Sequence, residues 1–340
     1  MSRERSLATG VPRSRGLRRR DRYALVAASL TAVSLTASGC VVVHGEREVL
    51  PAATKAEAVK AVEQFTAAYN KADAAYDSSL DADRTAGALR VIDEARLKAG
   101  HVTDPQGNPD HEPLVLSDVK YTIVEKPGWP RWFVADAKGS KGGDARWLMA
   151  FTRGGLSEPW RATYLTLVAP GSVPRFDLDA DGHAEAVPAR TTGLAMAPAE
   201  LSKGYTAYLK SGKGAFADGA FTSALRSTRA KNATRPGLAT QYIDQPLTEG
   251  DYAPLALRTA DGGALVFFSS HHFTKQTAAA GAAVPTPNKN VAALTTGEIK
   301  QSLTMEFVAN EVALAPAKGA GGGKVSLLSR LEGLTGAEGA

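Results

Sequence analysis

Cysteine is the residue that this sequence has least of, with one, Cys40, in 340 residues. A single cysteine cannot form a disulfide within the chain, and it cannot supply a zinc site built from cysteine pairs. The apolar core must therefore hold the fold together. Hydrophobic residues make up 44% of the chain and charged residues 22%, which is the balance of a globular protein.

The sequence also lacks the local motifs of the common enzyme classes. It contains no G-x-S-x-G nucleophile elbow, no G-x-G-x-x-G dinucleotide loop, no phosphate-binding loop and no H-E-x-x-H zinc motif. His271 and His272 are adjacent in an expected strand, so they point to opposite faces and cannot bind one ion together. We predict no cofactor, and a protein that is not an enzyme is the favoured interpretation.

The N-terminal segment indicates export. Eight arginines precede an apolar stretch at residues 23–37, which is shorter than the roughly 20 residues of a membrane-spanning helix. The run Leu35–Cys40 resembles the lipobox of bacterial lipoproteins, with Ala37 where that motif usually has leucine. The resemblance implies that residues 1–39 are a signal peptide and that Cys40 is acylated with palmitate-type chains. It places the protein on the outer face of the cytoplasmic membrane; an uncleaved membrane anchor is the alternative.

Removal of this leader changes the charge balance. Residues 1–39 hold eight of the 40 basic residues and two of the 35 acidic ones, so 32 basic and 33 acidic residues remain. The sequence pI of about 9.2 therefore describes the leader. A near-neutral chain has no basic patch on which to base nucleic-acid binding, and we predict no nucleic-acid partner.

The segment after the leader begins with a tether and continues into an α+β domain. Residues 40–54 have no sustained period and could span up to about 45 Å when extended. Residues 55–175 form the first predicted domain. Thr54 and Glu57 have the spacing of a capping box, and apolar residues then follow at helical spacing. A second helix over 86–98, ending at Gly100, precedes a meander of strands.

The same order recurs in the second half of the sequence. An acidic linker at 176–196 leads to a second predicted domain at 197–334, with a tail at 335–340. Strands are expected at 253–259, 264–273, 303–314 and 324–330, with a long loop at 278–297. The segment Thr206–Gly212 can be laid over Ala67–Asp73 at an offset of 139 residues. We predict a tandem repeat of two α+β domains; unrelated domains, or one larger domain, are the alternatives.

The acidic linker contains a candidate cation site. Three aspartates alternate before Gly182, and alternate carboxylates on a tight turn can surround a hard cation such as calcium. The predicted metal ligands are Asp177, Asp179, Asp181 and Glu185. Pro188 occupies the place of the bidentate glutamate of an EF-hand, so a solvated acidic linker is the favoured interpretation of this segment.

All four tryptophans, Trp129, Trp132, Trp147 and Trp160, fall among the strands of the first half. On one exposed face they could stack on the sugar rings of a cell-wall glycan. Strand tryptophans more often fill a core. Trp129, between Gly128 and Pro130 in a predicted turn, is expected to be the most exposed.

Helices that precede a curved antiparallel sheet resemble the cone-shaped NTF2-like and cystatin-like folds, and the whole exported chain resembles a tandem pair of such domains in uncharacterised actinobacterial surface lipoproteins. This resemblance implies a pocket between helix and sheet in each half. The predicted pocket residues are Tyr69, Tyr76, Tyr205 and Tyr208.

These observations favour a lipid-anchored cell-surface protein of binding or scaffold type, with an unidentified protein, glycan or small molecule as its ligand. A small-molecule-binding or enzymatic cone is one alternative, and glycan binding through exposed tryptophans is the other. We expect a monomer that is attached to the membrane through its N-terminal lipid.

Overall fold

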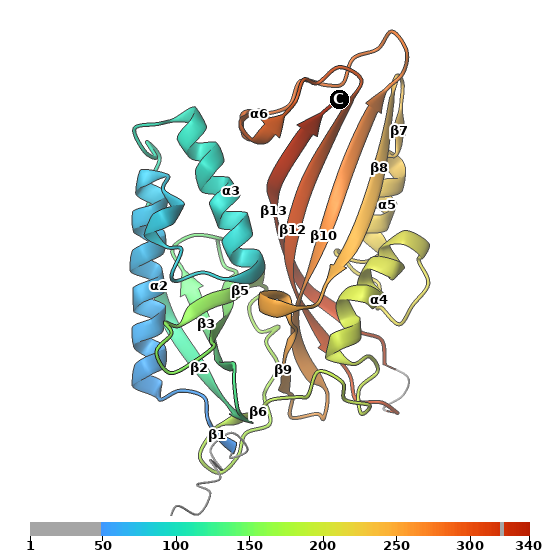
Figure 1. Ribbon diagram of the computed structural model, residues 1–340. Helices are drawn as coiled ribbons and strands as arrows, with labels where there is room; N and C mark the ends of the chain where they lie inside the picture. Colours follow the sequence, from blue (N-terminus) through green and yellow to red (C-terminus); the bar gives the residue numbers. More distant parts are fainter. Residues whose placement is uncertain (1–48, 320–322) are drawn as a thin grey trace, which may run out of the picture. The chain divides into compact units, whose positions relative to one another are not determined.

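Two sheets, each accompanied by helices, make up the part of the chain that the computed structural model describes, residues 49–319 and 323–340 (Figure 1). Residues 47–340 form one compact unit. A mixed α+β protein with two mainly antiparallel sheets is thus confirmed. The cone architecture, the tandem repeat and the division into two domains stay predictions.

The first sheet is built around a meander of long strands. In spatial order its strands are β1 (Val49–Pro51), β2 (Leu116–Pro127), β3 (Arg131–Gly139), β4 (Arg146–Arg153) and β5 (Arg161–Val168), and β6 (Ala184–Glu185) pairs with β2 in parallel. Two helices and a short 3-10 turn precede the meander: α2 (Lys55–Ala75), η2 (Ser78–Leu80) and α3 (Gly87–Thr103).

Helix α2 begins with the predicted capping box. The Glu57 amide donates to Thr54 Oγ1 at 3.1 Å, and the Thr54 amide donates to Glu57 Oε2 at 2.8 Å. These two bonds satisfy amide groups that have no partner within the helix, which stabilises such a helix by about 1 kcal/mol. Phe65, fully buried on the inner face of α2, packs edge-on against Phe151 of β4. The helix therefore covers one face of the first sheet.

Helix α3 runs further than the sequence pattern predicted. It passes through Gly100 and ends at Thr103, with Asp104 as its C-cap. Gly100 is buried, and a Cβ added there would collide with the ring of Tyr76, the left-handed C-cap of α2. This glycine thus permits a close approach between two helices, and the prediction that it ends the helix was wrong.

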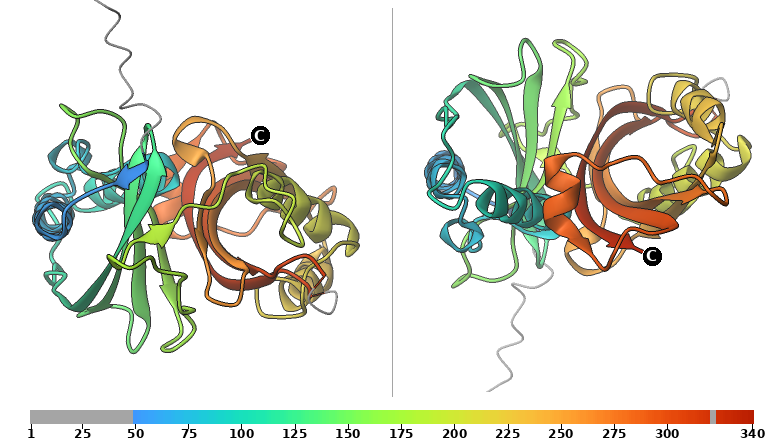
Figure 2. Two further views of the ribbon diagram at one scale, coloured as in Figure 1. Left: turned by 90° about the horizontal axis from the view of Figure 1, so that it is seen from below. Right: turned by 90° about the horizontal axis from the view of Figure 1, so that it is seen from above.

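The second sheet has longer and more curved strands. In spatial order they are β11 (Thr295–Thr296), β13 (Ser326–Gly339), β12 (Ser302–Ala315), β10 (Ala264–Ala278), β8 (Leu238–Leu247) and β7 (Thr234–Arg235), with β9 (Leu255–Arg258) paired to β10. Its helices are α4 (Pro198–Ser211), α5 (Ser223–Asn232), η3 (Gly250–Tyr252) and α6 (Lys289–Leu294). Figure 2 shows the sheet curving around the side where α4 and α5 lie.

Three segments of the second half differ from expectation. Strand β8 was not predicted, because its polar residues and Pro246 weaken the alternating pattern. The segment expected as a loop at 278–297 contains α6, which buries Val291 and Leu294. Strand β13 continues through Gly339, so residues 335–339 of the predicted tail belong to the sheet. The alternation in β13 is diluted by small residues, which explains why its end was missed.

The two sheets pack against each other through a shared apolar layer. Tyr164 of β5 meets Phe267 of β10, with ring centroids 5.8 Å apart, and both side chains are fully buried. Trp132 and Leu148 from the first sheet join the same layer, as does Val312 from the second. One face of the first sheet thus meets α2, and the other meets the second sheet.

Parts of the predicted linker at 176–196 are buried, so this segment is not solvated along its whole length. Ala184 in β6 is fully buried beside β2, and Val187 and Leu194 are buried in the core under α4. At the other end of the first half, β1 pairs with β2, and Ala52 and Ala53 are buried. The predicted tether therefore joins the sheet from Val49 onward; its earlier residues lie outside the described part of the chain.

Candidate functional site

A candidate site lies in a cavity of about 350 Å³ where α3 faces the second sheet. Helix α3 forms one wall with the residues of a single face, and β13 and α6 form the opposite wall. Trp147 of β4 and Leu165 of β5 also line it. Its volume lies at the lower end of the range of small-molecule sites, roughly 300–1,000 Å³.

The spacing of apolar residues in α3 explains the first wall. Residues that recur every three or four positions share one helix face. The cavity-lining apolar residues of α3 follow this rule and are Leu89, Ile92, Ala95 and Ala99. The two alanines leave space where larger side chains would fill it, so the helix itself creates part of the cavity.

On the opposite wall, Gly333 of β13 lets the strand approach the helix. A Cβ added to Gly333 would collide with the side chain of Ile92. Leu331, Glu332 and Leu334 line the cavity beside it on β13, and Leu294 of α6 extends the wall. This wall comes from residues about 240 positions away from α3 in the sequence.

One corner of the cavity is polar and is formed by Tyr69, Asp93 and Arg96. The Arg96 guanidinium donates from Nε and Nη2 to Asp93 Oδ1, at 3.0 and 2.7 Å, and from Nη1 to Asp73 Oδ1 at 2.5 Å. It also lies 5.5 Å from the centroid of the Tyr69 ring. These contacts hold the guanidinium at the edge of the apolar wall.

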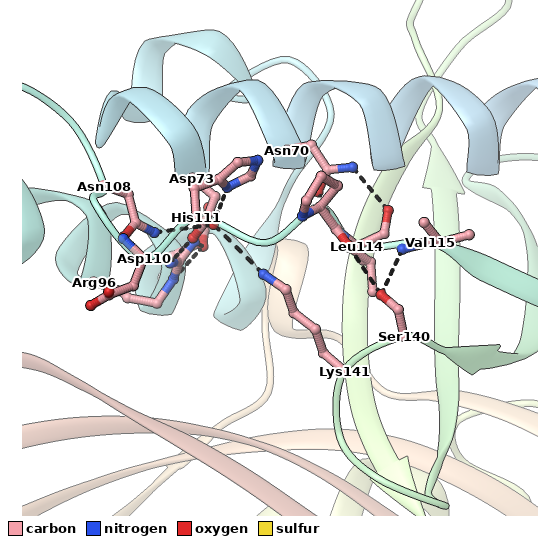
Figure 3. A network of polar contacts seen from close by, with 12 residues as sticks. Asn70, Asp73, Arg96, Asn108, Asp110, His111, Leu114, Val115, Ser140 and Lys141 are labelled. Atoms are coloured by element: carbon pink, nitrogen blue, oxygen red, sulfur yellow. Dashed lines mark hydrogen bonds and ion pairs between the residues drawn. The ribbon is translucent and has the colours of Figure 1, made fainter.

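Asp73, on α2, is the centre of this polar network (Figure 3). It is 3% exposed, and its Oδ2 accepts from Asn108 at 3.3 Å and lies 2.8 Å from His111 Nδ1 and 3.7 Å from Lys141 Nζ. Burial raises the pKa of Asp73, but the hydrogen bonds from His111 and Arg96, with the Arg96 charge, outweigh it and leave the pKa below its usual value. Asp73 is therefore an ionised carboxylate that fixes Arg96.

Behind Asp93 lies a second buried acid, Asp81. Asp81 is 2% exposed. The Oδ2 atoms of both Asp81 and Asp93 have no hydrogen-bond partner among the described residues. Burial, with the adjacent Asp93 carboxylate, raises the pKa of Asp81 to about 8. A proton held by Asp81 and shared toward Asp93 accounts for both unpartnered oxygens.

The four predicted pocket tyrosines lie in different environments. Tyr69 lines the cavity, and burial raises its pKa. Tyr76 packs over Gly100 instead. Tyr205 and Tyr208 are 0% and 5% exposed and pack with Phe216 and other residues in the core of the second half. In that half, the space expected for a pocket under α4 is occupied by aromatic side chains.

The predicted calcium ligands do not form one cluster. Within the described residues, the three side chains whose ligand atoms all lie within 4.8 Å of one another are Glu125, Asp179 and His183. Of the predicted ligands, only Asp179 belongs to this group. Glu185 faces Arg258 at 3.4 Å, and Asp177 and Asp181 are exposed on the loop. Calcium binding at the predicted residues stays a prediction.

The second half contains a buried polar cluster to which the sequence suggested no role. Glu311 of β12 is fully buried and accepts from Ser270 Oγ at 2.5 Å, with Arg330 Nε 3.5 Å away. Burial raises the pKa of Glu311 to about 8. His272 is 5% exposed, and its Nδ1 lies 3.0 Å from Arg330 Nη2. Burial and the Arg330 charge lower the pKa of His272 to about 2, so the imidazole is neutral.

The tryptophans are mainly core residues. Trp132, Trp147 and Trp160 are between 2% and 7% exposed, whereas Trp129 is 38% exposed. The guanidinium groups of Arg131 and Arg153 lie 5.1 and 5.7 Å from the Trp129 ring centroid. An exposed face that combines several tryptophans is therefore not formed.

Residues 49–339 match the family model described as "Domain of unknown function (DUF8094)". The chain belongs to this family. An uncharacterized lipoprotein of Streptomyces coelicolor is 68% identical over 322 residues, which cover 95% of this chain and 97% of that protein. An uncharacterized lipoprotein of Streptomyces avermitilis is 57% identical and covers 96% and 98%. A second Streptomyces coelicolor lipoprotein is 28% identical, with 79% and 78% covered.

These relatives confirm an actinobacterial lipoprotein of unknown function. No solved structure matches the DUF8094 chain. Among the described residues, no helix is both long enough and apolar enough to cross a membrane. The family match covers both sheets and both walls of the cavity.

Proposed function

We propose that this lipoprotein is a non-catalytic binding protein on the outer face of the cytoplasmic membrane, anchored by lipid on Cys40, and that the cavity between α3 and β13 takes a small ligand. The observation that carries the proposal is the cavity itself, about 350 Å³ in volume. Apolar walls with a few fixed polar groups are the usual make-up of such sites.

The order of the polar corner supports a binding role. Arg96 is held by two carboxylates, Asp73 and Asp93, and thus presents a group of fixed orientation before any ligand arrives. A preformed site loses less side-chain entropy on binding, which favours affinity. The charge of Arg96 is balanced by its partners, so the corner offers hydrogen bonds more than net charge.

The remaining features favour binding over catalysis in the second half. The aromatic side chains of Tyr205, Tyr208 and Phe216 fill the space where an NTF2-like enzyme would need a substrate pocket.

The burial of Trp132, Trp147 and Trp160 leaves Trp129 as the exposed tryptophan for any contact with a glycan. The names of the relatives, with the lipobox-like run before Cys40, support the lipid anchor.

The cavity can be tested with an uncharged fluorescent probe such as N-phenyl-1-naphthylamine. Residues 41–340, which contain the compact unit, should bind one equivalent with an increase in probe emission. Because Trp147 lines the cavity, its fluorescence should be quenched by the bound probe. Ala95→Leu places extra carbon atoms in the cavity and should weaken binding at least tenfold.

The matched control is Ala207→Leu, an exposed position in α4 on the other side of the second sheet. It should bind the probe like the parent chain. Circular dichroism of each variant establishes that it is folded. Absence of probe binding by the folded parent chain, or equal binding by the Ala95→Leu variant, would contradict a ligand site in this cavity.

A further inference from the structure

The chemical class of the ligand follows from the polar groups that the cavity wall leaves free. The charged residues in the wall are Asp93, Arg96 and Glu332. Asp93 is 4% exposed, and its Oδ1 is occupied by two bonds from Arg96. Glu332 is paired with Arg330. Both carboxylates therefore already face cationic partners.

Arg96 has donors left over. A guanidinium carries five N–H groups, and its hydrogen bonds to Asp73 and Asp93 use three of them among the described residues. Its side chain is 39% exposed although two partners fix it. One N–H on each terminal nitrogen thus has no partner among the described residues, and Arg96 is part of the cavity wall.

The charges around this corner do not favour an anion. Arg96 contributes one positive charge to the wall, against the two carboxylates of Asp93 and Glu332. Asp73 adds a further negative charge behind Arg96, and Lys141 adds a positive one at 3.7 Å from Asp73. A carboxylate or phosphate would meet no net positive potential, and it would lose its hydration on entering an apolar space. An ammonium group would also lose its hydration there, and the carboxylates of Asp93 and Glu332 already face Arg96 and Arg330.

We propose that the ligand is an uncharged amphiphile, with an apolar body between α3 and β13 and an acceptor oxygen, of an ester or a hydroxyl, hydrogen-bonded to Arg96. The inference rests on the proposed function, since it assigns the ligand class of the same cavity. Two sources could supply an apolar body with an acceptor oxygen. In the test, an acyl ester stands for a lipid and a long-chain alcohol stands for a soluble amphiphile.

The test compares decyl compounds that differ only in their head group. Methyl decanoate, decanol, decanoate and decylamine are titrated at pH 7.5 into residues 41–340, preloaded with N-phenyl-1-naphthylamine, below their micelle-forming concentrations. Methyl decanoate or decanol should displace the probe at least tenfold more effectively than decanoate and decylamine. Decylamine is protonated at pH 7.5 and cannot accept from Arg96, and a hydrogen bond from a charged donor contributes about 1.5–3 kcal/mol, which is consistent with such a factor. Decanoate can accept, but it must lose the hydration of its charge on entering an apolar space. Whether the ester or the alcohol binds better decides between a lipid and a soluble source.

The Arg96→Met variant removes the donors while it keeps the length of the side chain. It should lose the preference for the two uncharged compounds with an oxygen, so that the four compounds displace the probe with less than a threefold spread, whatever the variant's own affinity for the probe. If this variant fails to fold, the ranking of head groups on the parent chain still decides. Tightest binding of decanoate or decylamine overturns the ligand class and leaves the cavity site standing, whereas failure of the probe itself to bind overturns the site.

Discussion

At the scale of single residues, the two acids Asp81 and Asp93 show how burial changes chemistry. Neither Oδ2 atom has a partner among the described residues, and both side chains are nearly fully buried. Two charged carboxylates in such a place would repel each other strongly. The raised pKa of Asp81 keeps one of them neutral. The wall of the cavity is therefore coupled to the protonation of a residue that does not itself line it.

This coupling has a consequence for stability. The native Asp81 holds its proton up to about pH 8, whereas an unfolded aspartate loses it near pH 4. The contribution of Asp81 is therefore complete below pH 4 and is lost as the pH rises toward 8. Asp81→Asn stays neutral and keeps a donor for Asp93. It should unfold like the parent at pH 4 and be more stable by about 1 kcal/mol or more at pH 8.5.

Urea denaturation at a series of pH values measures this difference. Asp83→Asn is the matched control, because Asp83 is two residues away and its side chain is 63% exposed. The control should show a difference from the parent of less than about 0.5 kcal/mol throughout. A difference between the Asp81→Asn variant and the parent that does not change with pH would show that Asp81 is ionised in the native protein.

At the scale of elements, the contact between α3 and β13 decides whether the cavity exists. Gly333 allows this contact, because any Cβ there would collide with Ile92. Gly333→Ala should push the strand and helix apart and cost about 1–3 kcal/mol, the usual penalty of overpacking. It should also weaken probe binding. Gly336→Ala in the same strand is the control, since the nearest atom to its Cβ is the Glu306 Oε2 at 3.2 Å, the end of a flexible side chain.

Thermal unfolding and probe titration of both glycine variants give the two readouts together. The Gly336→Ala variant should stay close to the parent in both. Equal stability of the Gly333→Ala and Gly336→Ala variants would contradict the close contact between Gly333 of β13 and Ile92 of α3.

The sequence predicted those elements whose signals are local. Thr54 and Glu57 are three residues apart, so the start of α2 could be recognised from spacing alone. Gly100 is a typical helix end in sequence, and only the ring of Tyr76 from another helix explains why it lies inside α3. Local pattern therefore predicts where elements begin better than it predicts where tertiary contacts extend them.

Of the residues that line the candidate site, the sequence predicted only Tyr69 as a pocket residue. Tyr69 stood out on the apolar face of a helix, but Arg96 and Asp73 are 23 residues apart and meet only because α2 and α3 are neighbours. Leu294 and Gly333 reach the cavity from the end of the chain. Nothing in a single sequence signals such distant pairs, since their contact depends on how the two sheets pack.

At the scale of the whole molecule, the shared layer between the sheets makes their unfolding interdependent. All four tryptophans lie in the first half, so their fluorescence reports on that half, whereas far-ultraviolet circular dichroism reports on both. We expect one transition with the same urea midpoint by both methods. Phe267→Ala, a change in the second half, should cost about 3–5 kcal/mol and lower both midpoints together.

Midpoints that separate, or a Phe267→Ala variant in which the tryptophan signal keeps its parental midpoint, would mean that the halves unfold independently. That outcome would support the predicted division into two domains. The burial of Phe267 and Tyr164 in one layer is the reason to expect the opposite.

The pairing of β1 with β2 also limits how far the protein can reach. Because Val49 already belongs to the sheet, only residues 40–48 separate a lipid on Cys40 from the folded unit. Nine residues span about 30 Å at most when fully extended. With the proposed lipid on Cys40, the folded unit would therefore stay in a thin layer next to the bilayer and would meet most often those ligands that concentrate there. The outer layers of a thick cell wall would lie beyond its reach.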